Sequence, residues 1–394
     1  MDTVSLPPTA ASKEAKGRAR TPRTPAAIVT SYTRMDRPLS RSGIFRMPDP
    51  AVRKREQAQL EAILQHGVMP PAAAISVRSA DAVTTGAMAS VDHDGRRYLV
   101  DSTYTLGPEE LITLLAVCAL TGMAYHGKAK YEAVRQKAKR HVVERLIQAD
   151  LLDGLERDNA ANQLGGTGDE WRAGDYLRIK TTVHTLLREC GLATGGSSYW
   201  RMVASLIRLS RVAYCDLGAI GGNRARIRTG EQLLRVSIPD AGDGEEGITL
   251  VLNAKLTQIV LRQGADADGF FVDMGEVRRL RDGARIVHFR LSARVTSGSA
   301  QTIPVKELVE WAYGPNPCSP SAACNRRKRA AASLMQVGTL PGWIVGEATA
   351  YSKAYKIPPE GDAFCVYRLH TGETKEALDN RIPLRAFTAT TNRT

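Results

Sequence analysis

The stretch SPSAACNRRKRAAASLMQVG, residues 319–338, combines helix start and end signals with a run of basic residues. Ser319 is a favourable N-cap, Pro320 suits the first helical position, and Gly338 marks an end, so the stretch predicts one helix. At 3.6 residues per turn, its polar stripe holds Arg326, Arg329, Ser333 and Gln336, and its apolar stripe holds Ala330, Ala331, Leu334 and Val337. Such a helix can pack on one side and donate to DNA phosphates and base edges on the other, although a basic surface helix fits the same pattern.

A second stretch, SSYWRMVASLIRLSRV at residues 197–212, repeats the spacing of the polar stripe. Its polar residues also stand at positions i, i+3, i+7 and i+10: Ser198, Arg201, Ser205 and Arg208. A shorter amphipathic helix is expected before each stretch, over 181–190 and 305–313, and a β-rich segment follows each. Helix, turn, basic helix and hairpin form the order of a winged helix, and the order occurs twice.

Each predicted hairpin carries basic residues where a wing would lie. The first wing is expected in GAIGGNRARIRTG at 218–230, and the second in the segment from Gly342 to Ile357. We therefore expect DNA to be bound by a set of polar and basic residues from both helices and both wings. These are Ser198, Arg201, Ser205, Arg208, Arg224, Arg226, Arg228, Asn325, Arg326, Arg327, Lys328, Arg329, Ser333, Lys353 and Lys356.

Composition supports a polyanionic partner. The chain has 394 residues, a net charge of +13 and a pI near 9.6, which favours nucleic acid over a membrane surface. Residues 1–56 alone hold twelve Lys/Arg and five Asp/Glu. The longest apolar run, at 111–120, is too short to span a bilayer, and the six cysteines form no CxxC pair. We expect a cytoplasmic protein with reduced thiols and no membrane association.

The predicted fold class is α+β, with two tandem winged-helix (helix-turn-helix) domains behind a disordered basic N-terminal arm. The arm is expected over 1–50, because Pro, Thr, Ser, Ala and Arg recur there without periodicity. It could follow DNA phosphates or remain a solvated tail. The expected segments after it are a short helix and linker at 51–74, winged-helix domains at 75–263 and 264–370, and a flexible tail at 371–394.

Two elements at the start of the first domain have clear sequence signals. Residues 75–105 alternate polar and apolar side chains, with a turn at His93–Gly95, which predicts antiparallel strands. Residues 106–122 predict an amphipathic helix with Pro108 in its first turn. Glu109 and Glu110 follow directly, where the helix dipole favours negative charge.

Several of these segments, taken in order, resemble the replication initiator (Rep/RepC) proteins of IncQ-type plasmids. The resemblance runs with gaps over residues 75–357, and its colinear order is more specific than any single motif. Its segments are LGPEELITLLAVCALTG at 106–122, the helix pair VHTLLRECG and YWRMVASLIRLSRV, ITLVLNAKLTQIV at 248–260, VDMGEVRRLRDGARIVHFRLSARV at 272–295 and RRKRAAASLMQVGTLPGWIV at 326–345.

The resemblance implies a bacterial protein that binds directly repeated sites (iterons) in double-stranded origin DNA and promotes origin opening and helicase loading. It also implies that a plasmid-encoded helicase and primase act separately from this chain. Whether the chain forms a homodimer through the first winged-helix domain stays open. The N-terminal arm and an insertion at 124–178 depart from the family pattern.

Two other functions fit the same helices. A winged-helix transcriptional repressor would also bind duplex DNA, and a nucleoid or partition protein would bind it with little sequence preference. Catalysis is not expected, because the chain has neither a GxxxxGK[ST] phosphate loop nor an HxH cluster of the kind that nicking enzymes use. We expect no cofactor, and Cys318 and Cys324 lack further ligands for a metal site.

The missing motifs generate a prediction about enzymatic activity. Supercoiled DNA carrying the cognate origin should stay supercoiled when incubated with the purified chain and Mg²⁺ or Mn²⁺, as followed by agarose electrophoresis. Accumulation of nicked circles that disappears when a His or Tyr is replaced would contradict the expectation.

Overall fold

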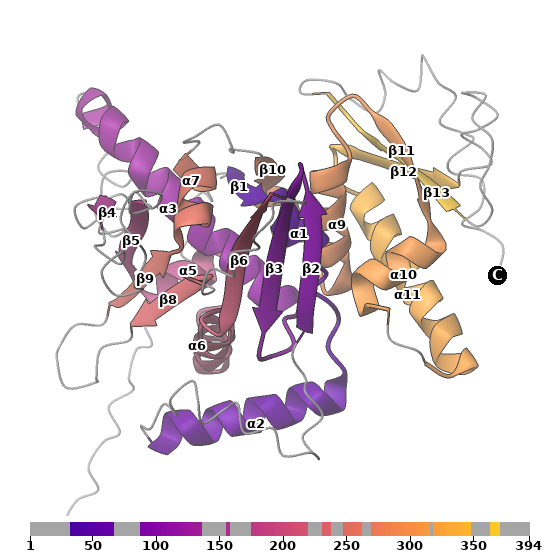
Figure 1. The fold of residues 1–394 in the computed structure, drawn as a ribbon, viewed down its shortest axis with the longest axis horizontal. Coiled ribbons are helices and arrows are strands. Elements are labelled where there is room, and N and C mark those ends of the chain that lie inside the picture. The colour runs from indigo at the N-terminus through magenta and orange to yellow at the C-terminus, as the bar shows by residue number, and fades with distance from the viewer. Residues whose placement is uncertain are drawn as a thin grey trace, which may run out of the picture.

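The computed structural model describes residues 32–66, 87–135, 155–157, 175–219, 231–237, 247–261, 269–315, 318–347 and 363–370. Helices and small antiparallel sheets are interspersed along these residues, so the predicted α+β class is confirmed (Figure 1). In this part of the chain, no helix is long and apolar enough to cross a membrane.

The first unit is built around α3, Pro108–Arg135, whose residues from Leu111 to Leu120 are buried almost completely. The helix starts where the sequence predicts, with Pro108 in its first turn. Two shorter helices pack near it, α5 (Val183–Glu189) and α6 (Gly196–Leu209). A sheet of order β4-β5-β9-β8 completes this part, with β4 at Leu155–Arg157, β5 at Asp175–Thr181, β8 at Leu234–Ser237 and β9 at Ile248–Leu252.

A second sheet of the first unit has the order β2-β3-β6-β7. Its first two strands form the predicted hairpin, and Asp94 and Gly95 at its turn both have positive φ, of 50° and 72°. Such a two-residue turn matches the twist of the strands and therefore fixes their register. The strands are β2 at Ala87–His93, β3 at Arg96–Ser102, β6 at Val212–Ala219 and β7 at Glu231–Gln232.

The second unit contains the basic helix that the sequence predicts at 319–338. α11 spans Pro320–Gly338, and the Ser319 side chain accepts a hydrogen bond from the Ala322 amide, as expected of an N-cap. The sheet beside it has the order β11-β13-β12. The remaining elements are α9 at Gly283–Arg294, β11 at Ala300–Pro304, α10 at Val305–Tyr313, β12 at Trp343–Glu347 and β13 at Ala363–Arg368.

The predicted disordered arm is wrong for its last third. Residues 32–50 contain β1 (Tyr32–Asp36) and α1 (Arg37–Arg41), and the side chains of Met35 and Leu39 are fully buried. β1 pairs antiparallel with β10 (Gly269–Asp273), more than two hundred residues away. A five-residue strand is too short to show periodicity among charged neighbours, so its partner could not be inferred. Residues 1–31 lie outside the described part.

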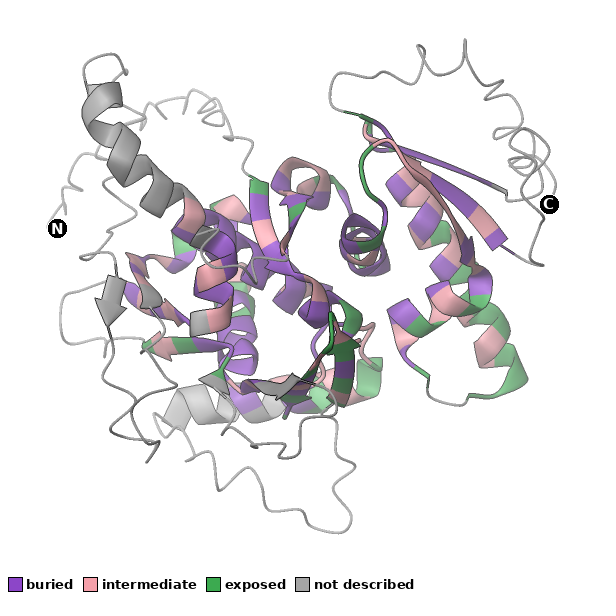
Figure 2. Ribbon diagram, turned by 45° about the horizontal axis from the view of Figure 1, so that its top comes forward, coloured by how far each residue is buried: buried purple, intermediate pink, exposed green. Residues whose placement is uncertain are grey.

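The predicted boundary at residue 263 does not separate two hydrophobic cores. The first core includes Phe270 and Val272 of β10 together with Phe289 of α9, all of which were assigned to the second domain. α9 also contributes to the second core, through Val287 and Leu291. Apolar residues therefore cover more than one side of this helix, which lies between the two units (Figures 1 and 2).

Three further helices connect these parts. α2 (Pro50–His66) matches the short helix predicted from residue 51, and α7 (Ala254–Leu261) and α8 (Met274–Arg279) follow β9 and β10 respectively. The predicted linker after α2 and the predicted tail at 371–394 lie outside the described residues.

The burial of β1 generates a stability prediction. Met35→Ala should lower the free energy of unfolding by about 2–5 kcal/mol, because it leaves a cavity in a packed core. Urea denaturation followed by circular dichroism measures the change. Met88→Ala is the matched control, since Met88 is 75% exposed and its loss should cost less than about 0.5 kcal/mol. Equal effects from the two substitutions would contradict the integration of residues 32–36 into the fold.

Candidate nucleic-acid interface

The N-terminal half of α11 presents a polar, basic surface to solvent. Exposed side chains recur along the helix at Ser321, Asn325, Lys328 and Ala332, which places them on one face. Arg327 and Arg329 are exposed on either flank of that face. The buried side chains Ala330, Leu334 and Val337 lie on the opposite face and enter the second core. This face of α11 can donate to phosphates and to base edges.

The C-terminal part of the stripe predicted to face DNA on α11, Ser333 and Gln336, lies against the protein, whereas Arg329 is exposed. Gln336 accepts a hydrogen bond from the Arg281 amide, and a Cβ placed on Gly283 would lie 2.9 Å from Ser333 Oγ. Ser333 therefore lies against the start of α9 and is partly buried, and its expected contact with DNA stays a prediction. The guanidinium of Arg326 lies 5.5 Å from the ring centre of Tyr313 and is half-buried. Spacing alone identified a polar stripe, but not the direction in which it points.

The corresponding stripe of α6 is largely buried. Ser205 and Arg208 are 2% and 1% exposed, so the expectation that they contact DNA is wrong. Both side chains donate to Glu110 Oε1 at 3.1 Å, and Arg208 also donates to Gln57 of α2 at 2.8 Å. A buried arginine needs a carboxylate partner, and this requirement fixes its direction toward the protein.

Glu110 is the centre of a buried ionic network. Its carboxylate is fully buried at the start of α3, accepts from the Gly107 amide at 2.7 Å and lies 2.6 Å from the Arg53 guanidinium. Burial acts to raise the pKa of this carboxyl, but Arg53 and Arg208 outweigh it, so the pKa lies below its ordinary value. The network therefore places one carboxylate between two arginines at the junction of α2, α3 and α6.

Among the described residues of α6, only those at its N-terminal tip are exposed to solvent. Trp200 is 52% exposed and the Arg201 side chain 64%, whereas Ser198 is partly buried. Trp200 is exposed because the tip projects beyond the core. Arg201 pairs with Glu109.

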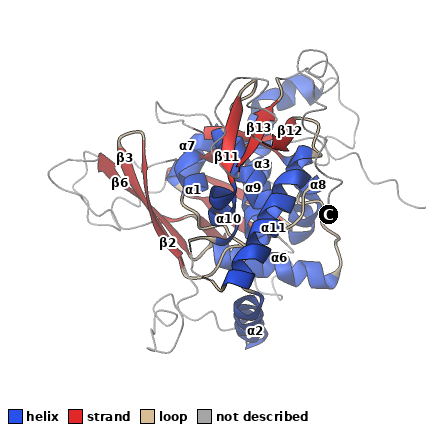
Figure 3. Ribbon diagram, turned by 90° about the vertical axis from the view of Figure 1, so that its right-hand side faces the viewer, coloured by secondary structure: helices blue, strands red, loops and turns tan. Residues whose placement is uncertain are grey.

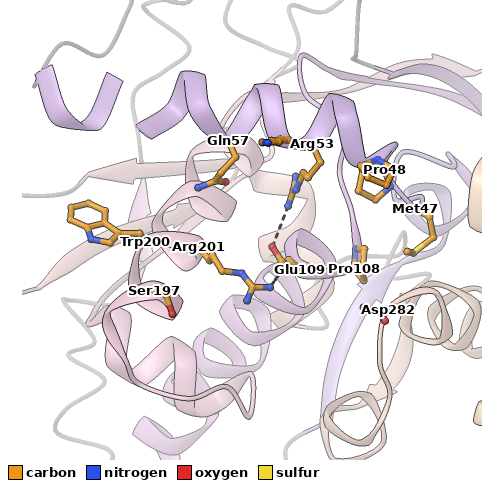
Figure 4. A pocket seen from close by; sticks show the side chains of 12 residues that line it. Met47, Pro48, Arg53, Gln57, Pro108, Glu109, Ser197, Trp200, Arg201 and Asp282 are labelled. Atoms are coloured by element: carbon orange, nitrogen blue, oxygen red, sulfur yellow. Dashed lines mark hydrogen bonds and ion pairs between the residues drawn. The ribbon is translucent and has the colours of Figure 1, made fainter. Parts of the chain in front are cut away.

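A cavity of about 990 Å³ lies between the tip of α6, the start of α3 and α2 (Figure 4). Met47, Pro48 and Pro108 provide much of its apolar wall. Arg53, Lys54 and Arg201 supply positive charge, and Glu109 and Asp282 supply negative charge. Since Asp282 precedes α9, the cavity borders both units.

The predicted wing residues lie outside the described part of the chain. These are Arg224, Arg226 and Arg228 of the first wing and Lys353 and Lys356 of the second. The strands that flank the second of these segments, β12 and β13, pair with each other antiparallel. The placement of the wings remains an expectation from sequence.

The fold defines a class: an α+β protein with small antiparallel sheets and an exposed basic helix. Residues 170–358 match the family model of Replication protein C (RepC). The match contains both helix pairs and confirms the resemblance to the Rep/RepC replication initiators. No curated protein matches the chain.

Two solved structures of RctB domains 2 and 3 are similar to this chain. The structure of RctB residues 155–483 has a TM-score of 0.42 and 12% identity, over 73% of this chain and 92% of that one. A selenomethionine derivative has a TM-score of 0.39 and 11% identity, over 76% and 98%. At these values the likeness carries no argument about function.

The buried network generates a pH-dependent prediction. Glu110→Gln should destabilise the fold by about 3–5 kcal/mol at pH 7.5, because the buried Arg208 loses its counter-charge. Since the folded pKa of Glu110 lies below its ordinary value, the wild-type advantage should be complete above about pH 5 and disappear as pH falls further. Urea denaturation between pH 3 and 7.5 measures this.

Glu109→Gln is the matched control for that experiment. Glu109 is 31% exposed, and its ion pairs should contribute less than about 1 kcal/mol at any pH. A loss in Glu110→Gln that is small, or that does not change with pH, would show that the network does not stabilise the fold.

Proposed function

We propose that the protein is a plasmid replication initiator that binds direct repeats (iterons) in double-stranded origin DNA and promotes origin opening. The observation that carries the proposal is the RepC match over residues 170–358, which includes the exposed basic face of α11. A net charge of +13 favours DNA as the partner.

We further propose that both units are winged helices. In the second unit, the order α9, β11, α10, α11, β12 and β13 and the strand order β11-β13-β12 support this assignment. In the first unit α3, β5, α5, α6, β8 and β9 follow one another in the same sense, with the strand order β5-β9-β8, but β6 and β7 of the second sheet are inserted between α6 and β8. In such a unit the second helix of the pair enters the major groove, so α11 would be the recognition helix of the second unit.

α11 is suited to both kinds of DNA contact. Asn325 lies on its outward face, and an amide can form a bidentate pair with adenine. Lys328 on the same face provides a positive charge for a phosphate, and Arg327 and Arg329 can serve guanine or phosphate from the flanks. The proposed contact set therefore keeps Asn325, Arg326, Arg327, Lys328 and Arg329 from the sequence prediction and omits Ser333.

The partners remain part of the proposal. An initiator of this kind would act with a plasmid-encoded helicase and primase, and homodimerisation through the first unit would affect how it occupies repeated sites. Binding without catalysis fits the motifs of the sequence. A transcriptional repressor with the same helices is the other candidate, and it differs in its site and in its effect on replication.

The proposal predicts distinct effects for two neighbouring substitutions. Asn325→Ala should relax the preference at one base pair by about 1–3 kcal/mol, whereas Lys328→Ala should weaken binding to every duplex about equally. Fluorescence anisotropy at fixed salt, against single-base variants of a site that the wild-type protein selects from a randomised duplex pool, measures both. Lys306→Ala is the control, because Lys306 is exposed on α10.

The selected site and a replication assay separate the two candidate functions. An initiator should select tandem direct repeats and restore replication of a minimal origin plasmid when supplied in trans. An inverted repeat, together with no effect on plasmid maintenance, would favour the repressor. Failure of the wild-type protein to prefer any duplex would contradict both.

A further inference from the structure

The side of α6 that the sequence assigns to DNA is covered by α2. Gln57 accepts from Arg208 at 2.8 Å, and Arg53 reaches the same Glu110 carboxylate that Ser205 and Arg208 contact. α2 is joined to α6 through these long side chains rather than through close helix packing. The cavity described above lies between the two helices (Figure 4).

α2 is attached to the first unit through two buried side chains, Leu60 and Glu56. Leu60 is 1% exposed and belongs to the first core. Glu56 is 3% exposed and accepts a hydrogen bond from the Thr105 amide at 3.2 Å. Moving α2 away would expose Leu60 and take Arg53 from the buried Glu110. The cost of both changes favours a helix that stays in place when DNA binds.

The outer side of α2 is basic. Lys54 and Arg55 are exposed near its N-terminal end, while Arg53 and Glu56 point inward to the network. Lys54 also borders the cavity together with Arg201 from the tip of α6. The N-terminal half of α2 and the tip of α6 therefore present positive charge from two helices around one opening.

This basic surface and α11 lie toward the same side of the molecule. α2 runs along the lower side in the view of Figure 1, and α11 extends down toward that side. The perpendicular view in Figure 3 shows the same relation. A duplex lying along this side of the molecule would meet α2 and the lower end of α11 (Figures 1 and 3).

We propose that α2 is a DNA-contacting helix, in which Lys54 and Arg55 bind the phosphate backbone of the duplex. In this arrangement α6 contributes only its tip, with Trp200 and Arg201, and its inner stripe has a structural role. The inference rests on the proposed function, because it names a further surface for the same duplex. The proposal assigns the DNA contacts of the first unit to Lys54 and Arg55 of α2, in place of Ser205 and Arg208 of α6.

Charge reversal on α2 tests the proposal in the full-length protein. Lys54→Glu combined with Arg55→Glu should lower affinity for the selected duplex by about thirty-fold or more at 0.15 M salt, if two phosphate contacts are lost. The slope of log K against log salt concentration should become shallower by about two. The preference among single-base variants should not change, because phosphate contacts carry no direct sequence information.

Two controls make the outcomes distinguishable. Lys306→Glu combined with Arg188→Glu reverses two exposed basic residues on α10 and α5, away from α2, and should leave the salt slope nearly unchanged. Thermal unfolding of each variant shows whether the fold is kept. Lys328→Glu on α11 reports on the proposed function itself.

The possible results lead to different conclusions. Loss of binding in Lys328→Glu with wild-type binding in the α2 variant would overturn the α2 proposal and leave the proposed function intact. Absence of duplex binding by the wild-type protein would instead overturn the proposed function. Tighter binding by the α2 variant would show that α2 obstructs the DNA site, which also contradicts the proposal.

Discussion

A buried carboxylate at the beginning of α3 constrains much of the first unit. Glu110 has no exposed surface, and an isolated charge in that position would be strongly unfavourable. Arg208 of α6 and Arg53 of α2 supply the compensating charge, with contacts at 3.1 and 2.6 Å. The need to satisfy this carboxylate therefore orients α6 and places α2 across it. Buried pairs of this kind often add little net stability, but they disfavour other arrangements of the same helices.

A second constraint couples the two units. α9 contributes Phe289 to the first core and Leu291 to the second, so neither core is complete without it. Glu276 of α8 strengthens the connection, because its carboxylate lies 2.8 Å from His288 and accepts from the Trp343 indole at 3.0 Å. The relative position of the two units is thus fixed by packing. For a DNA-binding protein this rigidity would set the spacing of the two contact regions before binding.

The candidate interface shows which DNA contacts a local sequence pattern can predict and which it cannot. Asn325 and Lys328 were expected to contact DNA, and their exposure on α11 is compatible with that role. The sequence predicted α2 as a helix but did not indicate the DNA contact that we propose for it. A basic, weakly periodic helix near an N-terminus has no feature that distinguishes it from a solvated surface helix. One signal was available, since Arg53 and Gln57 stand at i and i+4 and share a face. Their partners, however, are on α3 and α6 and cannot be read from spacing.

The sequence by itself determined the α+β class, the bounds of α10 and α11, the turn at Asp94–Gly95 and the family resemblance. These depend on caps, periodicity and turn residues, which act over a few residues along the chain. The tertiary structure decided the pairing of β1 with β10, the sharing of α9 between two cores and the burial of Arg208. Each of these depends on groups that lie far apart in sequence. An amphipathic pattern shows that a helix has a polar side, but only the packed partners decide whether that side meets solvent, DNA or a buried carboxylate.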